Sequence, residues 1–457
     1  MKFFQISILI ISLVVFSCSN SKENKKVFTV FSGTIKNPNS DSLSIMNVEY
    51  KIIHTFYLLN NKFTDTINIE KGFYYLTDGT ETTQIYLEPN FNLNLSLNAK
   101  EFDESLHYWG KGAYENNYLV KKTLLNESFG VKNYYGYYAK LDENRFLKDA
   151  DSIYQIKLDF LNKHKDSLNE EFYFIEYNDI KYGYLNKIAQ YEALKRFVMD
   201  NNEFTVSVNY PNPFNKVDLT NDLLLNSRNY LDFVDLHIAK ITTERINGFD
   251  SVDYQIAFLE TIKKEIKSTK LKEIMVFKTS ISSIDYTEEL DRYYGLAKSV
   301  LTNESHILEL TYKYNKLKRL SKGAASPNFE LKDINGNVYN LNDFKGKYVY
   351  IDIWATWCLP CLKEIPALME LEKEYKQIQF VSICKDDERE SWEKMVKDKQ
   401  LKGIQLFSSD ENISFFEEYM VRGVPRFILI DDNGKIIDAN AMRPSNPDIK
   451  KVFDDLK

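Results

Sequence analysis

Residues 354–361 read Trp-Ala-Thr-Trp-Cys-Leu-Pro-Cys and continue a hydrophobic run from Tyr348 that predicts a buried strand. Cys358 and Cys361 are therefore three positions apart, and two thiols at this spacing can form a disulfide and release it again. The chain contains no cysteine between Cys18 and Cys358, so the pair is not part of a structural disulfide framework. We interpret the pair as a site of redox chemistry.

The residues around this stretch alternate between strand and helix patterns. A hairpin around Asn335-Gly336-Asn337 precedes the strand, and a helix is expected from the cysteine pair to Tyr375. The pattern then predicts strands at 380–384 and 405–407, helices near 391–399 and 413–420, and a closing hairpin over 427–437. This order predicts an α/β domain that begins at the small, Gly- and Pro-containing segment 321–327.

Short stretches along this domain carry a specific resemblance: Pro327-Asn328-Phe329, Phe344-Lys345-Gly346-Lys347, residues 354–361 and Gly423-Val424-Pro425. With the order of elements, they resemble the TlpA/ResA-like thioredoxins over residues 321–457. The resemblance implies a thiol-disulfide oxidoreductase without a cofactor, in which Cys358 and Cys361 form the redox-active disulfide. It also implies that Trp357, Val424 and Pro425 contact the substrate and that the Val424–Pro425 bond is cis.

The position of Cys358 at the start of a helix suggests how the pair works. Unpaired amide N–H groups at a helix N-terminus favour a thiolate. We therefore expect Cys358 to be the attacking and more exposed thiol, and Cys361 to resolve the mixed disulfide.

Two carboxylates near the pair are candidates for catalytic roles. Asp352 interrupts the apolar strand, and a buried carboxylate takes up a proton or a partner because burial removes its solvation. It matches the buried acid of thioredoxins, which implies a general base for Cys361; an Asp simply hydrogen-bonded at the strand's end is the alternative. Glu364 shares a helix face with Cys361 and would raise the thiol pKa, favouring the disulfide and hence reduction of substrates. It matches an acidic residue of ResA-like proteins, and an acid complementing the helix dipole is the alternative.

A zinc site is another use of the Cys-x-x-Cys spacing. Zinc takes four ligands, but residues 321–457 contain no histidine and only Cys384 besides the pair. We therefore predict no metal site and expect Cys384 to pack as a small apolar residue.

The N-terminus predicts the compartment. Residues 3–16 are almost wholly apolar, follow a positive residue and are too short for a membrane span of about 20 residues, which is typical of a signal peptide. Val15-Phe16-Ser17-Cys18 resembles a bacterial lipobox, although Phe16 is bulkier than the usual residue there. The resemblance implies a lipoprotein signal peptide at 1–18, lipidation of Cys18 and a tether at 19–26. Secretion without a lipid is the alternative.

Residues 27–112 have a period of two, most clearly at 91–97, and predict a small antiparallel β domain. Phe31-Ser32-Gly33-Thr34-Ile35 and Leu87-Glu88-Pro89 resemble the β domain of unknown function that precedes thioredoxin-like domains in many bacterial lipoproteins. Further strands are expected at 27–35, 43–46, 64–69 and 84–87.

Residues 113–320 have helical periodicity and predict an all-α region. Its apolar stripes include Ile153, Ile156, Phe160 and Leu161 in one helix and Leu259, Ile262 and Ile266 in another. Tyr210-Pro211-Asn212-Pro213 predicts a loop between two helical groups.

Together these features predict an exported, lipid-anchored thiol-disulfide oxidoreductase in the cell envelope, facing the periplasm, with the choice of membrane open. The net charge of -7, with no long basic block, argues against nucleic acid as a partner. The resemblance implies that it reduces cysteine-containing extracytoplasmic proteins, takes electrons from a membrane thiol reductase and serves a pathway such as cytochrome c maturation.

Two other functions remain open at this point. A thiol peroxidase can have a related fold, although the Pro-x-x-x-Thr-x-x-Cys frame is missing. Alternatively, the first 300 residues form a binding module and the redox domain is secondary.

Overall fold

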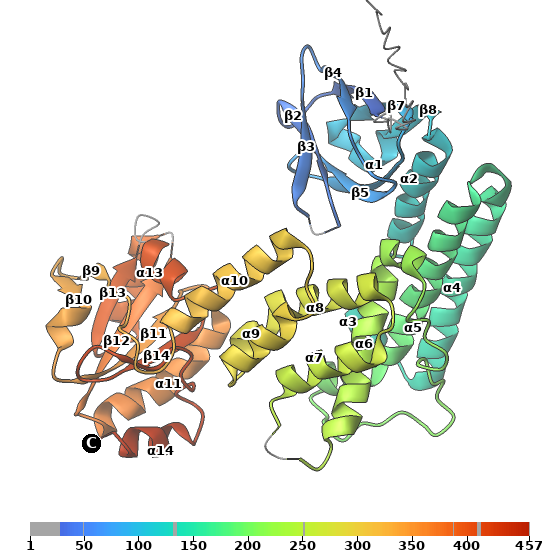
Figure 1. Ribbon diagram of the computed structural model, residues 1–457. Helices are drawn as coiled ribbons and strands as arrows, with labels where there is room; N and C mark the ends of the chain where they lie inside the picture. The colour runs from blue at the N-terminus through green and yellow to red at the C-terminus, as the bar shows by residue number, and fades with distance from the viewer. Residues whose placement is uncertain are drawn as a thin grey trace, which may run out of the picture. The chain divides into compact units, whose positions relative to one another are not determined.

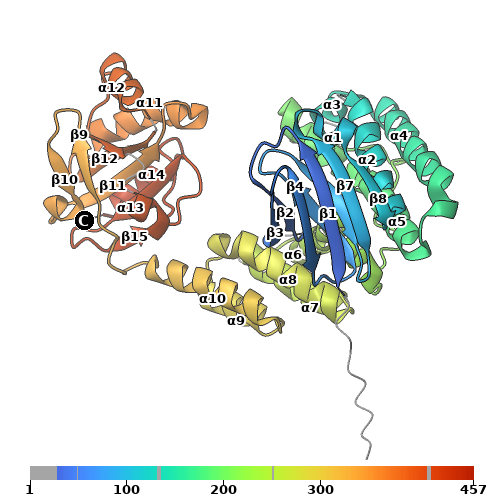
Figure 2. The ribbon, with the colours of Figure 1, turned by 90° about the horizontal axis from the view of Figure 1, so that it is seen from above.

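The computed structural model describes residues 28–456 except 49, 131–134, 250–251, 387 and 409–412. The signal peptide, the tether and Cys18 lie outside the described residues. Figures 1 and 2 show strands at the N-terminal end of this range, helices in the middle and an α/β domain at the C-terminal end, which confirms the predicted fold classes. The chain forms two compact units, Met1–Val217 with Leu223–Leu236, and Asp218–Asp222 with His237–Lys457.

The first unit begins with two four-stranded sheets. Their strands are β1 (Thr29–Lys36), β2 (Ser42–Met46), β3 (Ile52–Tyr57), β4 (Lys62–Ile67), β5 (Gly72–Thr77), β6 (Thr82–Leu87), β7 (Asn92–Asn98) and β8 (His107–Lys111). The sheet orders are β4-β1-β7-β8 and β3-β2-β5-β6. Leu93, Leu95 and Leu97 are buried, as the period of two predicts. The prediction of purely antiparallel pairing is wrong for β1 and β7, which pair in parallel because the chain passes through the second sheet between them.

Helices follow these sheets and complete the first unit. They are α1 (Phe102–Ser105), α2 (Ala113–Ser128), α3 (Tyr135–Ala139), α4 (Glu143–His164), α5 (Glu170–Met199) and the first part of α6 (Arg228–Ile246). The Pro-containing segment at 210–213 lies between α5 and α6, as predicted. Ile156, expected in the buried stripe of α4, is instead 42% exposed, because the stripe follows Phe146, Ala150, Ile153 and Leu161.

The second unit starts with the rest of α6 and a group of shorter helices. They are α7 (Tyr254–Glu265), α8 (Thr269–Ser283), α9 (Leu290–Lys298) and α10 (Glu304–Arg319). Leu259, Ile262 and Ile266 are fully buried, as the sequence pattern predicts. In the part of the chain that is described, no helix combines the length and the apolar character that crossing a bilayer requires.

The α/β domain at the end of the chain contains a seven-stranded sheet in the order β10-β9-β13-β12-β11-β14-β15. Its strands are β9 (Glu330–Asp333), β10 (Val338–Asn340), β11 (Tyr348–Trp354), β12 (Ile378–Lys385), β13 (Ile404–Ser408), β14 (Arg426–Ile430) and β15 (Ile436–Asp438). Its helices are α11 (Leu359–Glu374), α12 (Arg389–Asp398), α13 (Ile413–Glu418) and α14 (Ile449–Asp454). The central strand β11 pairs in parallel with β12 and antiparallel with β14.

The alternating side chains of β11 divide between two apolar cores. Val349, Ile351 and Ile353 pack in the core that contains residues of α13. Tyr350 packs in the other core, with residues of α11 and α14. Asp352, at an even position like Tyr350, belongs to the face that α11 covers.

Candidate active site

The cysteine pair lies where β11 ends and α11 begins. Cys358 is the N-cap of α11, and its Sγ accepts a hydrogen bond of 3.2 Å from the backbone N–H of Cys361. The two residues form a disulfide with their Cα atoms 5.3 Å apart. The strand-to-helix turn therefore places both sulfur atoms in the first turn of α11, as the sequence predicts.

The two cysteines are equally buried, at 3% exposure each, so the expectation that Cys358 is the more exposed residue is wrong for this disulfide state. Both pack in a cluster of buried residues with Trp354, Cys384 and Trp392. The exposed side chains are their neighbours, Trp357 at 70% and Leu359 at 64%. The disulfide is thus flanked by apolar side chains that a partner can cover.

The turn before the cysteines is held by a carboxylate that the sequence analysis missed. Asp386 accepts hydrogen bonds from the hydroxyl of Thr356 and from its backbone N–H, the latter at 3.0 Å. Asp386 follows β12, and the carboxyl ends of neighbouring parallel strands meet at one edge of a sheet. The parallel pattern of β11 and β12 was the signal that could have revealed this contact.

Cys384 is a fully buried free thiol opposite Trp354 in the β11–β12 register. Burial, with the nearby carboxylate of Asp386, raises the pKa of this thiol well above its usual range. A buried neutral thiol is a poor nucleophile, so Cys384 acts here as a packing residue.

Asp352 is a buried acid in the middle of β11. Burial raises the pKa of its carboxyl to about 7; a hydrogen bond with Ser382 opposes this rise, and the charges of Glu364 and Glu372 add to it. Asp352 lines a small cavity, and Ile365 and Leu368 of α11 line the same cavity.

Those two α11 residues connect Asp352 to the redox pair. Ile365 and Leu368 are four and seven positions after Cys361, which places all three on one helix face. Asp352 therefore lies below the stripe of α11 that begins with Cys361, with a pKa suited to accepting a proton near neutral pH.

Glu364 is also buried, and its partners come from a loop near the C-terminus. It accepts hydrogen bonds from the backbone N–H of Ser445 at 2.9 Å and from the Ser445 hydroxyl at 3.0 Å. A guanidinium nitrogen of Arg443 lies 3.9 Å from the same carboxylate. Arg443 thus partly balances the charge of Glu364. Ser445 lies 81 positions after Glu364 in the sequence, so no local pattern could have indicated this contact.

The Val424–Pro425 bond is cis, which confirms the expectation from the resemblance. Val424 packs against the cluster that contains Cys358 and Cys361. Pro425 is half-buried and directly precedes β14, the neighbour of β11. Of the predicted substrate residues, Trp357 thus directly precedes Cys358 in the chain, Val424 packs against the cluster of the disulfide, and Pro425 follows Val424 just before β14.

A metal site would need several ligands close together. Among the described residues, no group of three or more His, Cys, Asp or Glu side chains has that arrangement.

Comparisons with known proteins show what the C-terminal domain is similar to. The model of the Redoxin family matches residues 321–456. Thiol-disulfide oxidoreductase ResA of Bacillus cereus is 33% identical over 126 residues, which are 27% of this chain and 72% of that relative. Thioredoxin-like protein YneN of Bacillus subtilis is 30% identical over 30% of this chain and 80% of its own length. The crystal structure of the thioredoxin domain of a thiol-disulfide oxidoreductase from Bacteroides vulgatus is 30% identical, with a TM-score of 0.29 over 30% of this chain and 99% of that domain.

Proposed function

Because the chain belongs to the Redoxin family as a ResA-like thiol-disulfide oxidoreductase, we propose that it reduces disulfides of exported proteins while held to a membrane by a lipid on Cys18. The observation that carries the proposal is the redox disulfide at the start of α11, bordered by the exposed side chains of Trp357 and Leu359. A partner protein that covers these side chains brings its own disulfide to Cys358.

The reaction starts from the dithiol form. The N-terminal end of α11 and the N–H group of Cys361 favour a negative charge on the Cys358 sulfur. This thiolate attacks one sulfur of the client disulfide, the client S–S bond breaks, and the other client sulfur leaves as a thiolate that takes up a proton. The product of this step is a mixed disulfide through Cys358.

Cys361 completes the exchange. Its thiol gives a proton to the carboxylate of Asp352, and the resulting thiolate attacks the Cys358 sulfur. The mixed disulfide breaks, the client leaves with both sulfurs reduced, and the Cys358–Cys361 disulfide forms. Two electrons have passed to the client, so a membrane thiol reductase must supply two electrons to restore the dithiol form.

Trp357, Val424 and Pro425 form the client surface in this proposal. Trp357 supplies a large exposed ring, and Val424, shortly before β14, packs against the cluster that contains the disulfide. Clients are proteins with accessible cysteines outside the cytoplasm, which fits the lipobox resemblance of residues 15–18.

The direction of electron flow is tested by the reduction potential of the Cys358–Cys361 pair. We expect a value near or below about -270 mV, as in a reductant, and a value near about -120 mV would indicate an oxidant and contradict the proposal. Removing the negative charge with Glu364→Gln should raise the potential by up to about 30 mV, a shift kept small by Arg443. Glu374→Gln, at the exposed far end of α11, is the matched control and should leave the potential unchanged.

The membrane attachment is tested by Cys18→Ser. The unaltered protein should stay in the membrane fraction until detergent is added, because several acyl chains at about 0.8 kcal/mol per buried methylene hold it there. The variant should lack the lipid and appear in the soluble extracytoplasmic fraction. Equal membrane retention of both proteins would contradict attachment through Cys18.

A further inference from the structure

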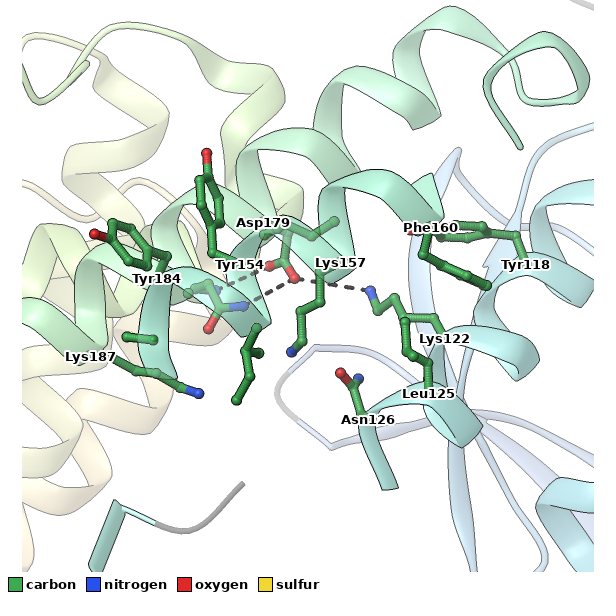
Figure 3. Close-up of a pocket in the computed structure, with 15 residues that line it drawn as sticks. Tyr118, Lys122, Leu125, Asn126, Tyr154, Lys157, Phe160, Asp179, Tyr184 and Lys187 are labelled. Atoms are coloured by element: carbon green, nitrogen blue, oxygen red, sulfur yellow. Dashed lines mark hydrogen bonds and ion pairs between the residues drawn. The ribbon is translucent and has the colours of Figure 1, made fainter. Parts of the chain in front are cut away.

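The first unit contains a pocket that the redox chemistry does not use. It has a volume of about 170 Å³ and lies among α2, α4, α5 and the start of α6. Figure 3 shows the side chains of Lys122 from α2, Lys157 from α4 and Lys187 from α5 directed toward this space. We call it the lysine pocket and define it by these three residues.

The two carboxylates near the lysine pocket, Glu176 and Asp179, already accept hydrogen bonds. Glu176 receives hydrogen bonds of 2.8 Å from Lys122 at both of its oxygens. Asp179 accepts from the Ser227 hydroxyl at 2.8 Å and the Asn229 side chain at 3.0 Å, and lies 4.0 Å from Lys122. These contacts place Lys122 in an ion-paired network at one side of the pocket.

Lys157 and Lys187 have a different environment. Lys187 donates to the Tyr138 hydroxyl at 3.2 Å and lies over its ring, and Lys157 lies 5.7 Å from the centre of the Phe129 ring. Within the described ranges, neither ammonium group lies within 4.0 Å of a carboxylate. Lys157 and Lys187 are half-buried. Holding a cation partly away from water without a counter-ion in contact is costly, so two such lysines lining one pocket favour an anion there.

Most of the rest of the lining is apolar or aromatic, with Asn126, Asp179 and Asn229 as the polar exceptions. The ring-bearing and aliphatic residues are Tyr118, Leu125, Ile153, Tyr154, Phe160, Ile180 and Tyr184. A cavity of about 150 Å³ with apolar walls accommodates a benzene ring. A bare inorganic anion would leave these walls uncovered, whereas a molecule with an apolar body would fill the space.

We propose that the lysine pocket binds a small organic anion, with its charged head group between Lys157 and Lys187 and its apolar body against the aromatic and aliphatic lining. A carboxylate and a phosphate monoester share this chemistry. The site belongs to the first unit and is independent of the disulfide exchange proposed above.

Protonation of Lys157 and Lys187 should make anion binding depend on pH. Burial, with repulsion from Lys187 and Lys122, lowers the pKa of Lys157 to about 8, although the charges of Asp179 and Glu176 oppose this shift. Burial lowers the pKa of Lys187 to about 8. A bound anion favours the charged ammonium forms, so binding near pH 8.5 should take up protons, and affinity should fall as the pH rises through about 8. The other titratable groups that line or adjoin the pocket are Tyr118, Lys122, Tyr154, Glu176, Asp179 and Tyr184.

The test is calorimetric titration of the full mature chain with benzoate and with phenyl phosphate at pH 7. Benzyl alcohol and inorganic phosphate are the comparison probes, since one lacks the charge and the other lacks the apolar body. We expect each to bind at least about tenfold more weakly than the better organic anion. Lys157→Met and Lys187→Met should each weaken that anion by about tenfold or more. Lys148→Met, at an exposed position of α4, is the matched control and should change affinity less than about twofold.

The outcomes separate clearly. Preference for phenyl phosphate over benzoate supports the proposal with a phosphate head group, and the reverse supports it with a carboxylate. Titration in two buffers of different ionisation enthalpy at pH 8.5 should show the proton uptake. Three results would overturn the proposal: no saturable binding of either anion by about 10 mM, benzyl alcohol or inorganic phosphate binding as tightly, or full affinity in both lysine variants with unchanged thermal unfolding.

Discussion

Cys358→Ser should abolish disulfide exchange, and Cys361→Ser should stop the reaction after its first step. Without the Cys358 sulfur the thiol at the N-cap of α11 is lost, and the described cysteines that remain are Cys361, within the first turn of α11, and Cys384, which is fully buried. We expect the rate at which Cys358→Ser reduces a protein disulfide to fall by roughly 10³-fold or more. The rate is measured from the appearance of client thiols. In Cys361→Ser the client should remain attached through Cys358, visible as a band on a non-reducing gel that disappears with a reducing agent.

Cys384→Ala is the matched control for both variants. It removes a third sulfur atom from the same packing cluster and should keep exchange within about twofold of the unaltered protein. Exchange by Cys358→Ser at the unaltered rate would show that another group is the nucleophile. Rapid peroxide consumption that survives in Cys361→Ser would instead favour a thiol peroxidase, since that chemistry needs a single attacking cysteine.

The α/β domain could be predicted closely because its signals are local. The strand at Tyr348–Trp354, the helix after the cysteine pair and the hairpin at 427–437 each have their own hydrophobic period or turn residues. The strands of the two N-terminal sheets were harder to predict. β3, β5 and β8 were not predicted, because their side-chain patterns alternate weakly and their burial depends on pairing with distant strands.

The contacts that support the site could not be predicted from local sequence patterns. Thr356 bonds Asp386 and Glu364 bonds Ser445 across 30 and 81 positions, so only the folded sheet brings them together. The equal burial of Cys358 and Cys361 also depends on packing by Trp392, which comes from α12. Sequence patterns locate the reacting groups, but tertiary packing determines what surrounds them.

Asp352→Asn should stabilise the oxidised protein at pH 8 and have little effect at pH 4. The folded-state pKa of Asp352 is about 7 and its ordinary value is 3.8, so between these pH values the folded state binds more protons than the unfolded state. Stability therefore falls as pH rises from about 4 to about 7, by on the order of 4 kcal/mol. The neutral amide removes this cost. Urea unfolding followed by tryptophan fluorescence would measure the difference, because three of the four tryptophans, at 354, 357 and 392, lie in this domain.

The same substitution separates a proton acceptor from a structural acid. If Asp352 accepts the Cys361 proton, resolution of the mixed disulfide should accelerate as pH rises through about 7, and Asp352→Asn should slow it by about 10²-fold and remove that step. Ser382→Ala removes a hydrogen bond that lowers the Asp352 pKa, and so should move the step to higher pH, whereas Glu372→Gln removes a repelling charge and should move it lower. If Asp352→Asn stabilises the protein at pH 8 without changing the rate of resolution, Asp352 is only a buried acid. Its charge would then destabilise the fold without contributing to catalysis.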